Sequence, residues 1–170
     1  MTTFAKKLIE IATSQLGKHE SGGVNKGSDL AQYFAADNYK PNATDDGYPW
    51  CAAFLCYVIQ KAMEACGVKE TATFKRPKTP SAFGYEDWSL AQDNTTWTKR
   101  SPGMDIKAGD IVILKHSHIV LATGDADPAT GVFPQISGNT SLAGSREGTH
   151  VLRHDAHFTS VRSRIRFRLP

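Results

Sequence analysis

The chain has 170 residues, of which 40% are hydrophobic and 22% charged, and its formal net charge is +3. This is the composition of a globular protein with its own core, and we expect a single domain over residues 1–170. The mild charge includes no basic run of the kind that binds nucleic acid, and no stretch approaches the roughly 20 apolar residues of a membrane span. The N-terminus lacks the apolar segment of a signal peptide, so we expect synthesis in the cytoplasm and action outside it only after release or secretion.

Two helices are predicted in the first part of the chain. Residues 4–16 carry apolar side chains at helical spacing, with Thr3 as a candidate N-cap and Gly17 directly after the end. A glycine-rich loop follows, and then a short helix is predicted from about residue 29 to residue 36, with Ser28 as its cap.

The next predicted helix begins at Cys51 and ends at Cys66, with Gly67 as its C-terminal cap. It is apolar nearly all round, which is typical of a helix in the centre of a fold. Unpaired N–H groups at a helix N-terminus lower the pKa of a cysteine thiol from about 8.5 to roughly 3.5–7.5. Cys51 is therefore a candidate nucleophile, with a buried, inert cysteine as the alternative, and Cys56 and Cys66 are expected to be core residues without disulfides.

Residues 68–108 are polar and rich in turns, and they are interpreted as a long excursion over the surface with one short helix around residues 81–90. Trp88 and Trp97 lie in this excursion. We expect both to pack against the core, with carbohydrate stacking as the alternative.

The remainder of the chain predicts antiparallel strands in runs of β-branched residues at 111–114, 118–121 and 132–136. Residues 161–169 alternate arginine with mostly apolar residues, which predicts a last strand with one face in solvent. The arginines are interpreted as a guard against edge pairing, with binding to anionic polymers as the alternative. Helices first and strands later indicate an α+β fold in which the central helix packs on an antiparallel sheet.

A thiolate nucleophile needs an imidazole nearby and a third group that orients the ring. Of the six histidines, His116 and His118 share one face of a predicted strand, and His118 is better embedded in the apolar run. The polar segment 135–140 closes the next strand. Within it Asn139 is the natural orienting residue, with Gln135 and Ser137 as alternatives. A His-x-His pair also occurs in zinc sites, but no third ligand falls at a convincing spacing, so we expect no metal.

Four short segments occur in a fixed order: GYPWCAAF at 47–54, AGDIV at 108–112, SHIV at 117–120 and SGNTS at 137–141. They resemble the nucleophile segment, the "PGD" segment, the catalytic "GHVGIV" strand and the "EGNTS" turn of one family. That family is the CHAP and NlpC/P60 group of papain-like cysteine hydrolases that cut peptidoglycan. The resemblance extends over most of the chain, although each motif alone is short.

The resemblance implies a papain-like α+β fold of the NlpC/P60 type. It implies an amide hydrolase with Cys51 as nucleophile, His118 as general base and acid and Asn139 as third residue, while Tyr48 and Trp50 line the substrate groove. The expected substrate is peptidoglycan, cut either between muramic acid and L-alanine or within the peptide stem or cross-bridge. No metal, organic cofactor, nucleic acid or membrane insertion is expected, and the protein is expected to be a monomer.

One position departs from the family pattern. Many relatives carry an acidic residue where this chain has Ser137, so the imidazole is expected to depend on Asn139 alone. The departure leaves open a catalytically silent module that binds cell wall. An antibacterial effector of the same chemistry, neutralised by an immunity protein, and a phage lysin both agree with the missing signal peptide. Some relatives bind calcium through acidic residues before the cysteine, but Asp45 and Asp46 are expected to be solvated.

Overall fold

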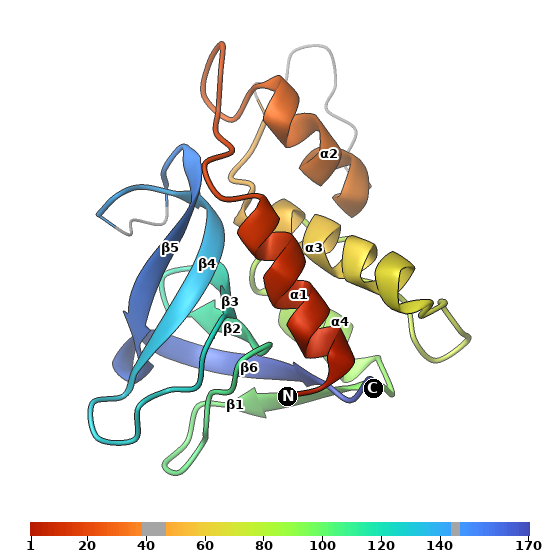
Figure 1. The fold of residues 1–170 in the computed structure, drawn as a ribbon, viewed down its shortest axis with the longest axis vertical. Helices are drawn as coiled ribbons and strands as arrows, with labels where there is room; N and C mark the ends of the chain where they lie inside the picture. The colour runs from red at the N-terminus through yellow and green to blue at the C-terminus, as the bar shows by residue number, and fades with distance from the viewer. Residues whose placement is uncertain (39–46, 144–146) are drawn as a thin grey trace.

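The computed structural model describes residues 1–38, 47–143 and 147–170. Within these ranges the chain forms four α-helices and the six strands of one antiparallel sheet (Figure 1). The helices are α1 (Thr3–Ser14), α2 (Ser28–Asp37), α3 (Cys51–Cys66) and α4 (Gly84–Leu90). The strands are β1 (Thr95–Lys99), β2 (Ile111–Leu114), β3 (His118–Ala122), β4 (Val132–Thr140), β5 (His150–His157) and β6 (Val161–Phe167), and their order in the sheet is β1-β6-β2-β3-β4-β5. The predicted α+β class is confirmed.

The helices begin and end close to the predicted positions. Helix α3 has the predicted bounds, and Gly67 closes it in the left-handed conformation at φ 66°, which favours glycine. The N-cap of α1 is Thr2 rather than the predicted Thr3, because the Thr2 hydroxyl accepts a hydrogen bond from the Ala5 amide at 3.2 Å. Ser28 is the first residue of α2 and not its cap.

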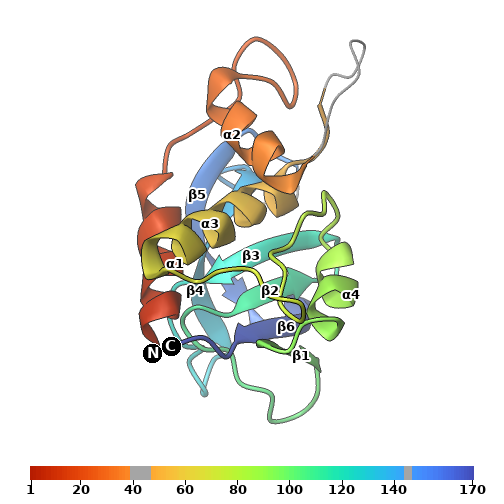
Figure 2. The same cartoon turned by 90° about the vertical axis from the view of Figure 1, so that its right-hand side faces the viewer.

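Helix α3 lies at the centre, with α1 and α2 packed against it on one side and strands β3 and β4 on the other (Figures 1 and 2). Alternate residues of β2 and β3 divide between the two faces of the sheet. Those that join the core beneath α3 are Ile111, Ile113, Ile119 and Leu121. Those that form a second cluster on the far face are Val112, Leu114, Val120 and Ala122. Burial on both faces explains why these strands read as continuous apolar runs.

Two strands and the position of a third differ from the sequence predictions. Strands β1 and β5 were not predicted, and β6 lies between β1 and β2 instead of at an edge. Arg164, in the middle of β6, is buried. The predictions of a solvent-facing last strand and of a guard against edge pairing are therefore wrong, because folding brings acidic partners to the arginines.

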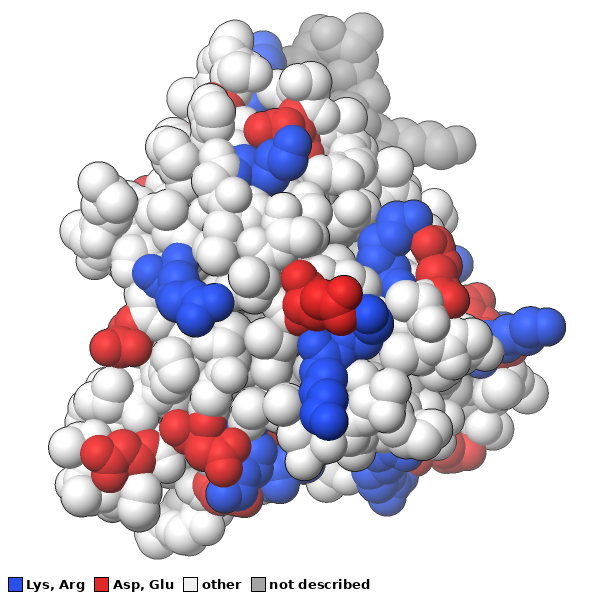
Figure 3. All heavy atoms as spheres, viewed as in Figure 1, with Lys and Arg blue, Asp and Glu red and all other residues white. Residues whose placement is uncertain are grey.

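These partners come from distant parts of the chain. Asp110 is 1% exposed, and its two carboxylate oxygens each accept a hydrogen bond from Arg166 at 2.8 Å. This bond to Asp110 raises the pKa of Arg166. Arg162 contacts Glu86 of α4 at 3.1 Å in the same manner. On the face seen in Figure 1, basic and acidic side chains are likewise interspersed, as Figure 3 shows.

The excursion over residues 68–108 contributes to the core as well as to the surface. The ring of Trp88 lies 5.7 Å from that of Tyr85 and 6.0 Å from that of Phe167. Trp97 packs against the same cluster. The prediction that both tryptophans pack against the core is confirmed. In the part of the chain that the structure describes, no helix has the length and apolar character needed to span a membrane.

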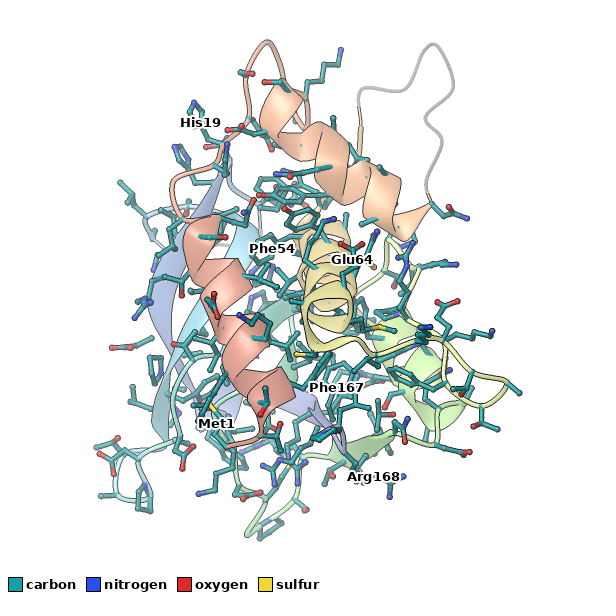
Figure 4. All side chains as sticks on the ribbon, turned by 45° about the vertical axis from the view of Figure 1, so that its right-hand side comes forward. Met1, His19, Phe54, Glu64, Phe167 and Arg168 are labelled. Carbon is teal, nitrogen blue, oxygen red and sulfur yellow. The ribbon has the colours of Figure 1, made fainter. Side chains whose placement is uncertain are left out.

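The segment between α1 and α2 forms an isolated antiparallel bridge to β5, through His19 (labelled in Figure 4) and His150. The Gly17 amide donates to the Val151 carbonyl at 3.0 Å, the Val151 amide donates to the Lys18 carbonyl at 2.8 Å, and the Glu20 amide donates to the Thr149 carbonyl at 2.8 Å. The predicted glycine-rich loop thus starts as a short strand partner and is held against the end of β5.

Gly138 in β4 marks the closest approach of the sheet to the start of α3. A Cβ atom at this position would lie 2.6 Å from Cζ3 of Trp50 and 2.8 Å from Cβ of Phe54. Only a residue without a side chain fits there, because such separations are far below van der Waals contact.

We predict that Gly138→Ala lowers the free energy of unfolding by about 1–3 kcal/mol, because the added methyl group forces α3 away from β4. Urea denaturation followed by circular dichroism measures the change. The control is Thr13→Ala at an exposed position of α1, where a change within about 0.5 kcal/mol is expected. Wild-type stability of Gly138→Ala would contradict the close approach.

Candidate active site

Cys51 is the first residue of α3, and 5% of its surface is exposed. The preceding residue, Trp50, is the N-cap, and its carbonyl accepts the amide of Phe54 at 2.9 Å. The helix therefore presents its N-terminal end at the cysteine, where a partial positive charge favours an anion. The sequence prediction of a cysteine at the first turn of a buried helix is confirmed.

Trp50 is held on two sides. Its indole N–H donates to a Glu20 carboxylate oxygen at 2.8 Å, and its ring stacks on Tyr33 with a centroid separation of 5.6 Å. Trp50 is fully buried. The family resemblance implies that Trp50 lines the substrate groove. In the structure Trp50 lies in the core, and its contacts fix the position of the helix start.

A pocket of about 360 Å³ opens beside Cys51. Its lining residues come from the segment before α3, from the excursion over residues 68–108 and from the turn before β3. They are Tyr48, Pro49, Cys51, Pro80, Ser81, Ala82 and Ser117. The pocket therefore joins the predicted nucleophile to Ser117, the residue directly before His118. Tyr48 lines this pocket, and its hydroxyl donates a hydrogen bond to Asp37.

His118 is the first residue of β3 and is 2% exposed. Its ring stacks on that of His116, with centroids 5.9 Å apart and an angle of 14° between the planes. The turn between them needs a left-handed residue, Ser117 at φ 60°. Figure 2 shows the beginnings of α3 and β3 on the same side of the molecule, which is the arrangement a cysteine and histidine pair requires.

Asn139 lies in β4, is 2% exposed and has a left-handed backbone at φ 55°. The pairing of β3 with β4 matches Leu121 with Ile136 and Ala122 with Gln135. The ladder does not continue to His118 or Asn139. A bulge between residues 137 and 140 in the pairing with β5 interrupts the alternation of β4 at this point and re-aims the residues within it.

The two alternative third residues also lie in β4. Ser137 and Gln135 are buried, and within the described ranges the Ser137 hydroxyl and the Gln135 amide oxygen have no hydrogen-bond partner. Gly138, between Ser137 and Asn139, faces the start of α3. The choice of Asn139 as the third residue stays a prediction.

The other two cysteines are distinct from Cys51. Burial raises the pKa of the Cys56 thiol to about 11, and the Tyr85 hydroxyl lies 3.2 Å from its sulfur. Cys66 is the last residue of α3 and packs against the core. All three cysteines are free, as predicted.

The site contains no cluster of metal ligands within the described parts of the chain, where no group of three or more His, Cys, Asp or Glu side chains is placed to hold an ion. Asp45 and Asp46, considered above for calcium, lie outside the described residues.

We predict that iodoacetamide at pH 8 alkylates Cys51 of the native protein and leaves Cys56 unmodified. With a pKa of about 11, roughly one Cys56 thiol in a thousand is ionised at this pH, whereas Cys51 opens into the pocket at a helix N-terminus. Peptide mass spectrometry over a time course measures both rates. In urea the two cysteines should react alike, and equal rates in the native protein would contradict the assignment.

Glu20→Ala is expected to lower the free energy of unfolding by about 1–2 kcal/mol, because the buried indole N–H of Trp50 loses its acceptor. Glu20→Gln keeps an acceptor oxygen and is expected to lose less than half of that amount. Urea denaturation at pH 7 compares the two variants. If both variants match the wild type, the bond to Trp50 does not hold the helix start.

Neither a known protein-family model nor a curated protein matches the sequence. Among solved structures, the crystal structure of the wild-type endolysin LysIME-EF1 aligns with 95% of this chain at a TM-score of 0.46 and 15% sequence identity. The alignment covers 63% of the endolysin chain, so this chain spans less than two thirds of that protein.

Proposed function

We propose that this protein is a cysteine hydrolase that cleaves an amide bond in bacterial peptidoglycan. The observation that carries the proposal is the pocket that Cys51, at the first position of buried helix α3, shares with the turn into His118. The four sequence motifs that resemble CHAP and NlpC/P60 hydrolases include both residues. The proposal depends on these motifs and on the pocket.

In the proposed reaction the Cys51 thiolate attacks the carbonyl carbon of the scissile amide, and the backbone N–H of Cys51 is a candidate donor to the resulting oxyanion. The carbon–nitrogen bond then breaks, and the His118 imidazolium gives its proton to the departing amine nitrogen. This leaves a thioester on Cys51. Water attacks the thioester carbonyl while His118 takes its proton, which releases the carboxylic acid product and restores the thiolate and imidazolium pair.

Asn139 is the proposed orienting residue for His118. Support comes from the motif resemblance, and strands β3 and β4, which carry the two residues, are neighbours in the sheet. An amide orients the ring without adding a negative charge, as in papain-like triads. The imidazolium is then stabilised mainly by the thiolate itself, and the ion pair is weaker than one backed by a carboxylate.

A catalytically silent module that binds cell wall is the second candidate function. Ser137, with a hydroxyl that has no partner among the described residues, stands where many relatives carry an acid. A site that lost its chemistry would tolerate such a change. The two functions differ in whether Cys51 matters for the release of wall fragments.

Cys51→Ala is predicted to lower the rate of release of soluble fragments from purified sacculi by at least about a thousandfold, because no other described group can replace the nucleophile. His118→Ala should have a similar effect. New amino and reducing ends are measured by chemical labelling and mass spectrometry, and circular dichroism confirms that the variants are folded. His116→Ala is the matched control and should keep most of the activity.

The same experiment separates the two candidate functions. Co-sedimentation of wild type and Cys51→Ala with sacculi, without new chemical ends in either sample, would favour the silent module. Undiminished release of fragments by the folded Cys51→Ala variant would show that another nucleophile or another mechanism operates.

A further inference from the structure

The excursion over residues 68–108 supplies one wall of the pocket beside Cys51. Pro80, Ser81 and Ala82 form this wall, and Tyr48 and Ser117 line the pocket with them. We call residues 80–82 the specificity wall. It is the part of the pocket that lies outside the four family-like motifs, so the motifs alone say nothing of its chemistry.

The specificity wall is fixed to the first turns of α3. The hydroxyl of Tyr85, just beyond the wall, lies 3.1 Å from the Ala52 carbonyl oxygen and 3.2 Å from the Cys56 sulfur. On the other side of the wall, the Cys56 thiol donates to the Thr79 carbonyl at 3.7 Å. Cys56 and Tyr85 are fully buried. Because these bonds join the wall to the helix that carries the nucleophile, the pocket has a preset shape.

The wall also has a local brace of its own. The Ser81 hydroxyl accepts the Gly84 amide at 3.2 Å, and the Ser81 amide donates to the Thr79 hydroxyl at 3.2 Å. A Cβ on Gly84 would lie 2.5 Å from that same Thr79 hydroxyl oxygen. The residues around the wall are therefore tightly packed, although Ser81 itself is exposed.

Apart from the proposed Cys51 thiolate, which forms an ion pair with the His118 imidazolium, the pocket carries no charge as far as the structure describes it. Among its described lining residues there is no aspartate, glutamate, lysine, arginine or histidine. A charged substrate group that entered would lose hydration without gaining an opposite charge, and that exchange is unfavourable. Two prolines, an alanine and three hydroxyl groups instead suit a small neutral residue and the polar atoms of its backbone.

We propose that the specificity wall selects an uncharged residue, such as alanine or glycine, next to the scissile amide and excludes residues with a free carboxylate or ammonium group there. This inference rests on the proposed function and narrows it. Cleavage falls at the junction of muramic acid with alanine or in a neutral cross-bridge. It does not fall beside the free carboxylate of a stem glutamate or the free amine of a diamino acid.

The first experiment identifies the cleaved bond by mass spectrometry of sacculi digested with the wild-type protein. The expected bond has an uncharged residue at the position next to the scissile amide on at least one side and no free charge on either. A bond beside a free carboxylate or ammonium group would overturn the inference and leave the proposed function intact. Absence of any released fragment would overturn both.

The second experiment uses synthetic peptides built around the identified bond, with glutamine, glutamate or lysine placed next to it. The wild type is expected to cleave the glutamine peptide with a kcat/KM at least about tenfold above that of either charged peptide. Equal values for all three peptides would contradict selection by charge.

Two matched variants of Ser81 test whether the specificity wall causes the preference for an uncharged residue. Asp and Asn both keep an acceptor for the Gly84 amide, but only Ser81→Asp adds a charge. Ser81→Asp should raise the ratio of lysine to glutamine peptide cleavage by about threefold, and Ser81→Asn should leave it at the wild-type value. An unchanged ratio in Ser81→Asp, with the glutamine peptide still cleaved, would show that residues 80–82 do not set the preference.

Discussion

The contact between the Trp50 indole and the backbone of Gly138 is the constraint on which the rest of the site depends. Each of these residues directly precedes a member of the proposed triad, since Cys51 follows Trp50 and Asn139 follows Gly138. A Cβ on Gly138 would lie 2.6 Å from the indole. The start of α3 and strand β4 are therefore held at one short separation. Glu20 holds the indole from the other side, so the start of α3 is fixed by residues that never touch a substrate. The precision that a nucleophile needs thus comes from core packing.

Much of the fold could be predicted because its signals are local. The apolar run from Cys51, ended by Gly67, gives the bounds of α3, and the apolar stretch of β2 gives its strand. Strand β5 has three exposed residues out of eight and carries charged and histidine side chains, so its sequence resembles a loop. Strand β1 is short and consists of three threonines, one tryptophan and one lysine. Both are strands because of partners far along the chain, which no window of sequence contains.

The site divides in the same way. The motifs indicate Cys51, His118 and Asn139, because each occupies a recognisable place at the start or end of an element. The core position of Trp50 was beyond prediction, since its hydrogen bond goes to a residue 30 positions away. The wall at residues 80–82 was also beyond prediction. Nothing near these residues in sequence shows that Tyr85 and Cys56 attach them to α3. The arginines of β6 follow the same rule, because Arg166 and its partner Asp110 are 56 residues apart.

The position of β6 has a consequence for how the molecule is made. Strands β1 and β2 do not pair with each other, and β6, the last element described, lies between them. During synthesis, β1 and β2 therefore cannot join one sheet until β6 leaves the ribosome. Until then the carboxylate of Asp110 has no ion pair with Arg166. Pairings between distant segments form slowly and expose apolar surface while they form. The helices and the hairpin of β2 and β3 can form early, but the complete six-stranded sheet forms only late in synthesis.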